Sequence, residues 1–376
     1  MAKQIYTPTP ARIKAVGIGG GGSNAITRMV REEIKGVDFI AMNTDGQALA
    51  LAEAPTRIQL GEKLTRGLGA GGDNKVGTKA AEESRDTVEE LVRGADMVFV
   101  AAGMGGGTGT GGIPVVAEVA KQSGALTIAV VTKPFSFEGS HRSQVAEEGL
   151  LDLSNKVDTL IIIPNDRLLQ LCDAKTSVDN AFRLADDALL LGVQAISEVV
   201  TIPGLINLDF ADIKSVMKDA GPAWMSVGKA SGQSRAAEAA KAALASPLLD
   251  VSVTGASGVL FNITGGPSLT LFECNEAAQV ISEAVSPNAN IVFGVVFDSK
   301  MDSEVRITVI ATGFGKQWGK GISSADELRR LIRGSSEVLD VPSFLRRGQH
   351  FAGSHFDGSS KTPEKVSPEP AKISRQ

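Results

Sequence analysis

Three glycine-rich segments have the composition expected of loops that bind phosphate. The first is Gly17–Asn24, the second is Gly103–Gly112, with seven glycines in ten residues, and the third is Gly67–Asp73. Glycine lets backbone N–H groups approach an anion at a helix N-terminus, where the helix dipole favours negative charge. Ordering so much glycine would be costly for a simple turn. We therefore interpret the three loops as walls around one triphosphate, with Thr108 and Thr110 offering hydroxyl groups.

Two other nucleotide-binding classes fit this pattern less well. Residues Gly17–Gly22 match G-x-G-x-x-G, but that motif is weak alone, and a tight strand–helix turn needs similar glycines. A dinucleotide oxidoreductase needs one such loop, and we identify no catalytic histidine among His141, His350 and His355. A P-loop NTPase needs a lysine after the loop, which the chain lacks.

A second group of candidate catalytic residues is Asn207, Asp209 and Asp212. Asp209 suits the N-cap of a helix expected over Ala211–Asp219, and Asp212 suits its first turn, so capping alone explains both acids. A helix expected over Thr176–Val200 would span roughly 35 Å. It would keep these acids out of reach of a nucleotide bound by the glycine loops of the same chain.

An α/β core is expected to position the loops. Continuous apolar runs indicate strands buried on both faces, hence a mostly parallel sheet covered by helices. The expected strands are Ile13–Ile18, Val37–Met42, Met97–Ala102, Thr127–Thr132 and Leu160–Ile163, with helices at Asn24–Glu33 and Pro114–Lys121. Pro114 suits the first turn of its helix.

A long amphipathic helix and a second α+β region follow. Apolar residues recur at three- and four-residue steps over Thr176–Val200, with Thr176 as the N-cap and Pro203-Gly204 as the end. Beyond it we expect strands at Gly258–Thr264, Leu269–Glu273, Ile291–Phe297 and Glu304–Thr312, and helices at Arg235–Ala245, Glu276–Val285 and Ser324–Arg333.

Composition narrows the class of partner. The net charge is −5 without a basic cluster in the body, and aromatics make up 5% of the chain. Both observations argue against nucleic acid as a partner. Cys172 and Cys274 are expected to stay reduced, as in a cytosol. No run of about 18 apolar residues occurs, so we expect no membrane insertion.

Residues Gly105–Gly111, GGGTGTG, resemble the tubulin-type signature. From about Arg12 to Phe314 the chain resembles the FtsZ family of bacterial tubulin-like cell-division GTPases. The resemblance runs in order through Met42–Asp45, Thr132–Glu138, Ile163–Asp166 and Asn207–Asp212. It implies a Rossmann-like GTP-binding domain, a long central helix and a second α+β domain.

The resemblance also implies a set of residues that bind GTP or GDP. They are Gly20, Gly21, Gly22, Ser23, Asn24, Asn43, Asp45, Ala70, Gly71, Gly103, Gly106, Gly107, Thr108, Gly109, Thr132, Glu138, Arg142, Asn165, Phe182 and Asp186. The glycine loops would hold the phosphates, and Glu138 and Arg142 would lie at the ribose. Phe182 would stack on the base.

Specific contacts to guanine and to magnesium are implied as well. Asn24 would reach towards the guanine, and the Asp186 carboxylate would accept two N–H groups from it, which adenine cannot offer. Asp187 is adjacent, so the register is open by one residue. Asp45 would orient a magnesium ion through water, with the ion held mainly by phosphates and water.

Plainer interpretations remain for several of these residues. Phe182 lies on the apolar stripe of its helix and suits the core. Glu138 and Arg142 are spaced as a surface ion pair of small value. Asn24 suits the beginning of a helix.

The resemblance completes the mechanism with a second copy of the chain. In FtsZ-like proteins, residues matching Asn207, Asp209 and Asp212 reach the nucleotide of the next subunit and polarise the attacking water. It therefore implies a head-to-tail homopolymer that hydrolyses GTP between subunits. A nucleotide-binding regulator or partitioning protein that assembles without hydrolysis is the alternative, and Asp209 and Asp212 argue against it.

Eight segments are expected along the chain. They are an N-terminal arm (1–10), the GTP-binding domain (11–175), the central helix (176–200), the acidic loop and its helix (201–220), the C-terminal domain (221–315), a linker (316–337), a peptide (338–348) and a tail (349–376). Leu339–Arg347 resembles the FtsZ peptide that binds membrane-anchoring and regulatory partners. The protein is expected in the cytoplasm, assembling at the division site.

Overall fold

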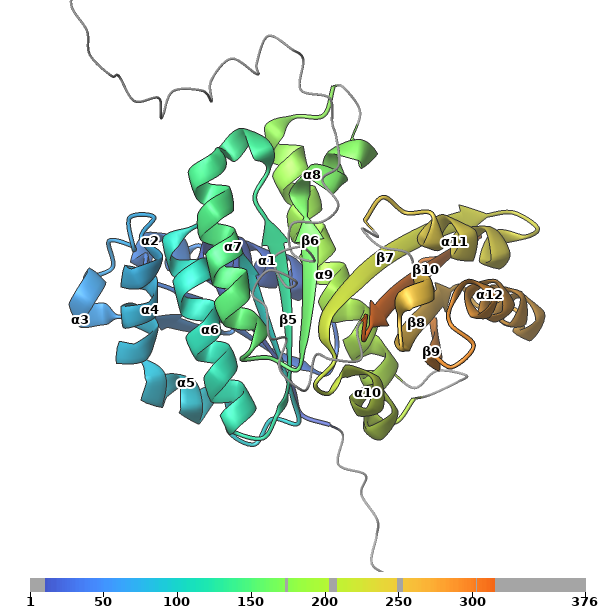
Figure 1. The fold of residues 1–376 in the computed structure, drawn as a ribbon, viewed down its shortest axis with the longest axis horizontal. Helices are drawn as coiled ribbons and strands as arrows, with labels where there is room; N and C mark the ends of the chain where they lie inside the picture. Colours follow the sequence, from blue (N-terminus) through green and yellow to red (C-terminus); the bar gives the residue numbers. More distant parts are fainter. Residues whose placement is uncertain (1–10, 173–174, 203–207, 249–252, 302, 315–376) are drawn as a thin grey trace, which may run out of the picture. The chain divides into compact units, whose positions relative to one another are not determined.

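The computed structural model describes residues 11–172, 175–202, 208–248, 253–301 and 303–314 (Figure 1). All of them lie within the first of two compact units, Met1–Ser335. The expected N-terminal arm, the helix at Ser324–Arg333, the linker, the peptide, the tail and Asn207 lie outside the described residues.

Ten strands form one sheet in the order β3-β2-β1-β4-β5-β6-β7-β10-β8-β9. The strands are β1 (Ile13–Ile18), β2 (Val37–Asn43), β3 (Thr56–Gln59), β4 (Met97–Gly103), β5 (Leu126–Lys133), β6 (Thr159–Pro164), β7 (Gly221–Ser231), β8 (Gly258–Gly265), β9 (Asn290–Phe297) and β10 (Glu304–Thr312). The first six pair in parallel, as the continuous apolar runs predicted for all of them except β3, which was not expected as a strand.

Helices cover both faces of the parallel strands (Figure 1). They are α1 (Gly19–Arg31), α2 (Gly46–Ala50), α3 (Glu62–Thr65), α4 (Asn74–Glu83), α5 (Arg85–Val92), α6 (Gly107–Gln122), α7 (Ser140–Ser154), α8 (Asn165–Leu168), α9 (Val178–Thr201) and α10 (Phe210–Met217). Side chains alternate across β1: Ala15 joins the core beneath α1, α9 and α10, and Val16 the core beneath α4 to α7.

The second part of the sheet is mixed. Strand β10 pairs antiparallel with β7 and β8, β8 pairs parallel with β9, and β7 continues the parallel part through Thr159–Ile161 of β6. Helices α11 (Arg235–Leu244) and α12 (Leu271–Ala284) pack on it around a core of their own. The α/β fold with a long central helix and a second α+β region is therefore confirmed.

The strand expected over Leu269–Glu273 is wrong. Thr270 caps α12, its hydroxyl accepting the Glu273 N–H while the Glu273 side chain accepts the Thr270 N–H. Leu271 and Phe272, whose apolarity suggested a strand, are 74% and 69% exposed in the first turn of that helix. The Thr-x-x-Glu spacing is the signature of this capping box.

Three helix beginnings also differ from expectation. Helix α9 begins at Val178 with Ser177 as its cap rather than Thr176. Helices α1 and α6 begin inside the glycine loops, at Gly19 and Gly107, so Pro114 lies within α6 instead of its first turn.

Candidate nucleotide-binding site

The first two glycine loops are the beginnings of helices α1 and α6. These helices follow β1 and β4, which pair in parallel, so both begin at the same edge of the sheet. Neither helix has a side-chain cap or an acidic residue in its first turn. Their first N–H groups have no intrahelical acceptor, so this edge offers two unfilled anion-binding helix ends.

The two loops approach each other more closely than any side chain would permit. A Cβ on Gly19, whose φ is +73°, would lie 2.8 Å from the Gly109 nitrogen, and one on Gly21 would lie 3.3 Å from the Gly103 nitrogen. A Cβ on Gly22 would lie 2.4 Å from a β4 carbonyl. Together the loops form one continuous backbone wall.

Gly20 is different from its neighbours. It is exposed, and a Cβ added to it would meet no heavy atom within 4 Å. Packing of the protein therefore does not require glycine at this position. The open space beside it would admit a ligand at the wall.

The third loop closes on the beginning of α6. A Cβ on Gly107 would lie 2.9 Å from both the Ala70 Cβ and the Asp73 nitrogen. Gly71 is exposed with φ +60° and open space at its Cβ position. The Thr108 hydroxyl lies 2.5 Å from the Thr44 hydroxyl of the loop after β2. Thr44, which belongs to the Met42–Asp45 segment, was not identified as a site residue from the sequence.

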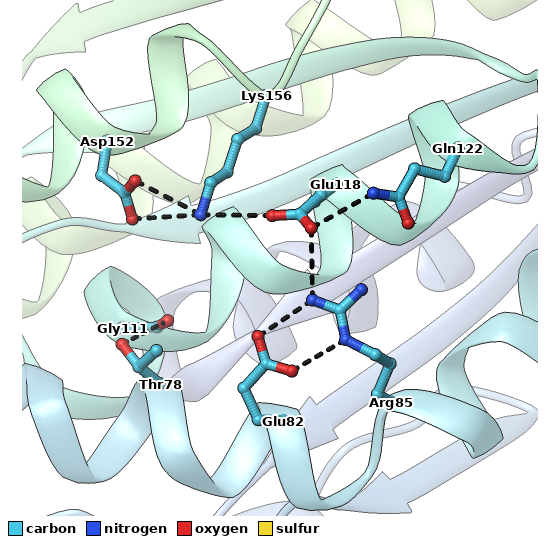
Figure 2. A network of polar contacts seen from close by, with 8 residues as sticks. All are labelled: Thr78, Glu82, Arg85, Gly111, Glu118, Gln122, Asp152 and Lys156. Atoms are coloured by element: carbon cyan, nitrogen blue, oxygen red, sulfur yellow. Dashed lines mark hydrogen bonds and ion pairs between the residues drawn. The ribbon is translucent and has the colours of Figure 1, made fainter.

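Helices α4 and α6 pack closely at Gly77 and Gly111, which fixes the third loop relative to the second. The Thr78 hydroxyl donates to the Gly111 carbonyl at 3.0 Å, as Figure 2 shows. A Cβ on Gly77 would lie 2.1 Å from the Gly107 oxygen, and one on Gly111 would lie 2.0 Å from the Asn74 oxygen. The helices thus touch through backbone, which leaves little freedom for either loop.

Ion pairs extend this contact to α7 (Figure 2). Arg85 pairs with Glu82 and Glu118, and Lys156 pairs with Glu118 and Asp152. The Glu82 pairing raises the pKa of Arg85 above its usual range, and the pKa of Glu82 is lowered in turn. Because these side chains are partly exposed, we expect the pairs to stabilise the fold only slightly.

Asn43 and Asp45 follow β2 beside this wall. The buried Asn43 carboxamide accepts the Asp45 N–H at 3.2 Å. Asp45 Oδ1 caps α2 by accepting the Gln47 and Ala48 N–H groups. Among the described residues, no group of three or more His, Cys, Asp or Glu side chains is placed to hold a metal. Asp45 Oδ2, which has no hydrogen bond among the described residues, is one carboxylate oxygen that would suit a magnesium ion held mainly by phosphates and water.

Glu138 and Arg142 form the ion pair that their spacing suggested, at 2.9 Å. Glu138 is not a surface residue: its side chain is 8% exposed, and its other oxygen accepts the Phe135 N–H at 2.8 Å. A Cβ on Gly106, the N-cap of α6, would lie 3.9 Å from the Arg142 guanidinium. The pair therefore borders the second glycine loop.

Phe182 is not a core residue, although it occupies the apolar stripe of α9. It is 41% exposed and meets the rings of Phe135 and Phe137 edge-on, at centroid distances of 5.3 and 6.4 Å. These two rings stack on each other at 5.0 Å. They hold Phe182 in place while leaving part of it free to pack on a planar ligand. Neither of the two was identified from the sequence.

Asp186 and Asp187 differ in environment. Arg28 of α1 forms an ion pair with Asp187. Burial raises the pKa of Asp186 to about 7, since the favourable charge of Arg28 only partly offsets desolvation and the Asp187 charge raises it further. Asp186 is partly buried, and in its ionised form it could accept two N–H donors from a ligand.

Several buried polar atoms here have no hydrogen-bond partner among the described residues. They are Asn165 Oδ1, Ser23 Oγ and Arg28 Nε. Buried polar atoms are normally paired, so these three are available to hydrogen-bond a polar ligand. Asn24 is exposed on α1, and Thr132 is buried at the end of β5, its carbonyl accepting the Met104 N–H.

Asp209 and Asp212 lie elsewhere. They form a reciprocal capping box at the beginning of α10, with the Asp212 N–H donating to Asp209 Oδ1 at 2.8 Å and the Asp209 N–H to Asp212 Oδ2 at 3.3 Å. The predicted capping role is confirmed. Both are exposed. α8 and α10 lie at opposite ends of α9 (Figure 1), whose 24 residues span about 36 Å.

Comparison with known proteins agrees with this geometry. Residues 12–173 match the model of the Tubulin/FtsZ family, GTPase domain, and residues 221–315 match the FtsZ family, C-terminal domain. None of the described helices has the length and apolarity to cross a membrane.

Solved structures give the same picture. The chain is 45% identical to the empty FtsZ dimer of M. jannaschii, over 82% of this chain and 90% of that one, with a TM-score of 0.80. A tryptophan-to-tyrosine mutant of the same FtsZ matches at 45% identity, over 81% and 91%, with a TM-score of 0.79. The GTPγS-bound CetZ2 protofilament of Haloferax volcanii shares the fold at 19% identity, over 81% and 94%, with a TM-score of 0.70.

Proposed function

Because this chain belongs to the tubulin/FtsZ family, we propose that its GTPase site is divided between two copies. The protein is a GTPase that polymerises in a GTP-dependent manner and serves cell division. One subunit supplies the nucleotide pocket, and the next supplies Asp209 and Asp212, at the beginning of its α10, together with Asn207.

Roles within the pocket follow from position. The N-termini of α1 and α6 hold the phosphates, and Ala70 and Gly71 close over them. Phe182 packs on the base, and Asp186 accepts its N1–H and 2-amino group. Glu138 and Arg142 lie at the ribose. Asp45 uses Oδ2, which has no hydrogen bond among the described residues, to orient water on a magnesium ion.

The observation that carries the proposal is the position of the two acids. They are exposed at the end of α9 that lies away from the pocket, so they do not reach a nucleotide bound in the same chain. In a head-to-tail filament that end meets the pocket of the next copy. There a carboxylate can orient and polarise the water that attacks the γ-phosphorus.

Protein concentration tests the divided site directly. GTP turnover per molecule should be close to zero in dilute solution and rise steeply above a critical concentration, together with light scattering. Turnover that stays constant over a hundredfold dilution without polymer would contradict the proposal. It would favour a complete site in each chain.

The remaining assignments extend the proposal to the rest of the chain. We place the domain boundaries at 11–175, 176–200, 201–220 and 221–315, which the two matched segments support. We place the protein in the cytoplasm, at the division site. Leu339–Arg347 joins an apolar run to two arginines and would bind an anchoring partner; deleting residues from Leu339 onward should abolish that binding and leave assembly and hydrolysis nearly intact.

A further inference from the structure

Helix α10 carries the two proposed catalytic acids in its capping box, and its other end is held by two threonines. Thr159 of β6 donates its hydroxyl to the Met217 carbonyl. The Thr312 hydroxyl of β10 donates to the Val216 carbonyl at 3.1 Å and shares its proton with the Gly258 carbonyl at 3.2 Å. Both threonines are buried, with 0% and 1% exposure. The last carbonyls of a helix lack intrahelical donors, so these hydroxyls fix where α10 ends.

The packing around Thr312 leaves no room for another arrangement. A Cβ on Gly258 would lie 2.6 Å from the Thr312 hydroxyl and 2.9 Å from the Val216 side chain. Val216 and Met217 are buried in the core. The two threonine hydroxyls therefore bind the end of a helix whose last side chains are already buried in the core.

A hydrogen-bonded chain reaches from β9 to Asp212 itself. The Asn290 carboxamide donates to the Ser215 hydroxyl at 3.1 Å, and that hydroxyl donates to the Asp212 carbonyl at 2.7 Å. The first turn of α10 is thus also linked to the C-terminal part of the sheet.

We propose that Thr159 and Thr312 are positioning residues for hydrolysis. Thr159 belongs to the parallel part of the sheet, and Thr312 belongs to the antiparallel part. The end of α10 is therefore hydrogen-bonded to both parts. By fixing its end they set where Asp209 and Asp212 are presented to the nucleotide of the next subunit. This inference rests on the proposed divided site.

The test replaces each hydroxyl by a methyl group of similar shape, in Thr159→Val and Thr312→Val. GTP turnover per polymerised subunit should fall about tenfold or more, because small displacements of catalytic groups are costly. GTP affinity measured below the critical concentration should stay within about twofold of wild type, since the pocket is unchanged. Thr159→Ser and Thr312→Ser should restore turnover.

A matched control is Thr127→Val, which removes a buried hydroxyl that donates to the Ala125 carbonyl at 3.1 Å and makes no hydrogen bond to α10. It should hydrolyse GTP normally. Mixing either valine variant with Gly107→Val, whose pocket is blocked but whose α10 is intact, should restore turnover at mixed interfaces.

Two outcomes would overturn the inference. The first is normal turnover in both valine variants while Asp212→Asn is slow. The second is a loss that accompanies weakened GTP binding and is not restored by mixing, as a general loss of fold would give. Normal turnover by Asp212→Asn would instead overturn the proposed function, and this inference with it.

Discussion

Arg28 of α1 forms an ion pair with Asp187 of α9. The preceding carboxylate, Asp186, has no ion pair or hydrogen bond among the described residues, and its pKa is raised by burial to about 7. The two adjacent acids therefore have different tasks. Asp187 ties α9 to α1, and Asp186 is left without a protein partner, which supports our proposal that Asp186, and not Asp187, contacts the base.

The first prediction exchanges the base that the site prefers. Asp186→Asn replaces one acceptor by an amide donor, which suits xanthine because xanthine carries a carbonyl where guanine carries its 2-amino group. GTP affinity should fall by about 100-fold or more, and XTP should compete better than GTP. Competition binding with both nucleotides measures this. Asp187→Asn is the matched control and should still prefer GTP; the reverse pattern would assign the base to Asp187.

The second prediction concerns pH. The ordinary pKa of an aspartate is near 4, so burial leaves Asp186 protonated in the free protein below about pH 7. Only the ionised form accepts both guanine donors, so binding must release this proton. GDP affinity should rise about tenfold per pH unit up to about 7 and then level off.

Calorimetry of GDP binding in buffers of different ionisation enthalpy counts that proton. Wild type should release about one proton more at pH 6 than Asp186→Asn does. Asp187→Asn removes a charge that raises the pKa of Asp186, so it should release less than wild type. Protons from the nucleotide phosphates are common to all three proteins and cancel in the comparison. Equal release by wild type and Asp186→Asn would show that Asp186 does not lose a proton when the nucleotide binds.

The third prediction tests whether the glycines of the first loop serve phosphate binding or only allow a tight turn between β1 and α1. Gly20→Ala adds a Cβ that meets no protein atom within 4 Å, so the thermal stability of the ligand-free protein should not fall. Nucleotide affinity should fall, because the methyl group occupies the ligand's side of the wall. Gly22→Ala is the contrasting variant: its Cβ would lie 2.4 Å from the Ala101 carbonyl and should destabilise the fold. Unchanged GTP affinity in Gly20→Ala would favour the turn.

The sequence allowed the parallel strands to be predicted because they are buried on both faces and read as unbroken apolar runs. Ile13–Ile18 was placed with both bounds as the structure has them. Strand β7 was missed because its Gly-Pro beginning and its Lys229 dilute the apolar signal. Leu271 and Phe272 led to a strand being predicted where helix α12 begins, because these two apolar residues are exposed in its first turn.

The site was predictable only as far as its local motifs reach. Glycine spacing located the phosphate wall, and the resemblance supplied Phe182 and Asp186. Contacts made by folding were not visible: the Thr44–Thr108 hydroxyl pair joins segments 64 residues apart. Spacing also suggested that Glu138 is exposed, whereas its side chain is 8% exposed and accepts the Phe135 N–H.

The last prediction separates nucleotide binding from hydrolysis. Asp212→Asn keeps an oxygen that can accept the Asp209 N–H, so the capping box and the fold should survive. It removes the charge that polarises water across the interface. The variant should bind GTP and assemble normally, and its hydrolysis should fall by about 10²- to 10⁴-fold, the scale for losing a general acid–base group. Its polymers should then persist, as light scattering would show.

A complementary variant completes the experiment. Gly107→Val with Thr108→Ala should abolish nucleotide binding, because a Cβ on Gly107 would lie 2.9 Å from Ala70 and Asp73 atoms and the hydroxyl opposite Thr44 is lost. Neither variant should hydrolyse GTP alone. In a mixture, the first supplies an intact pocket and the second an intact α10, so turnover should return as the fraction of mixed interfaces rises. If Asp212→Asn alone hydrolyses GTP at the wild-type rate, the residue is only a helix cap and the divided site loses its catalytic acid.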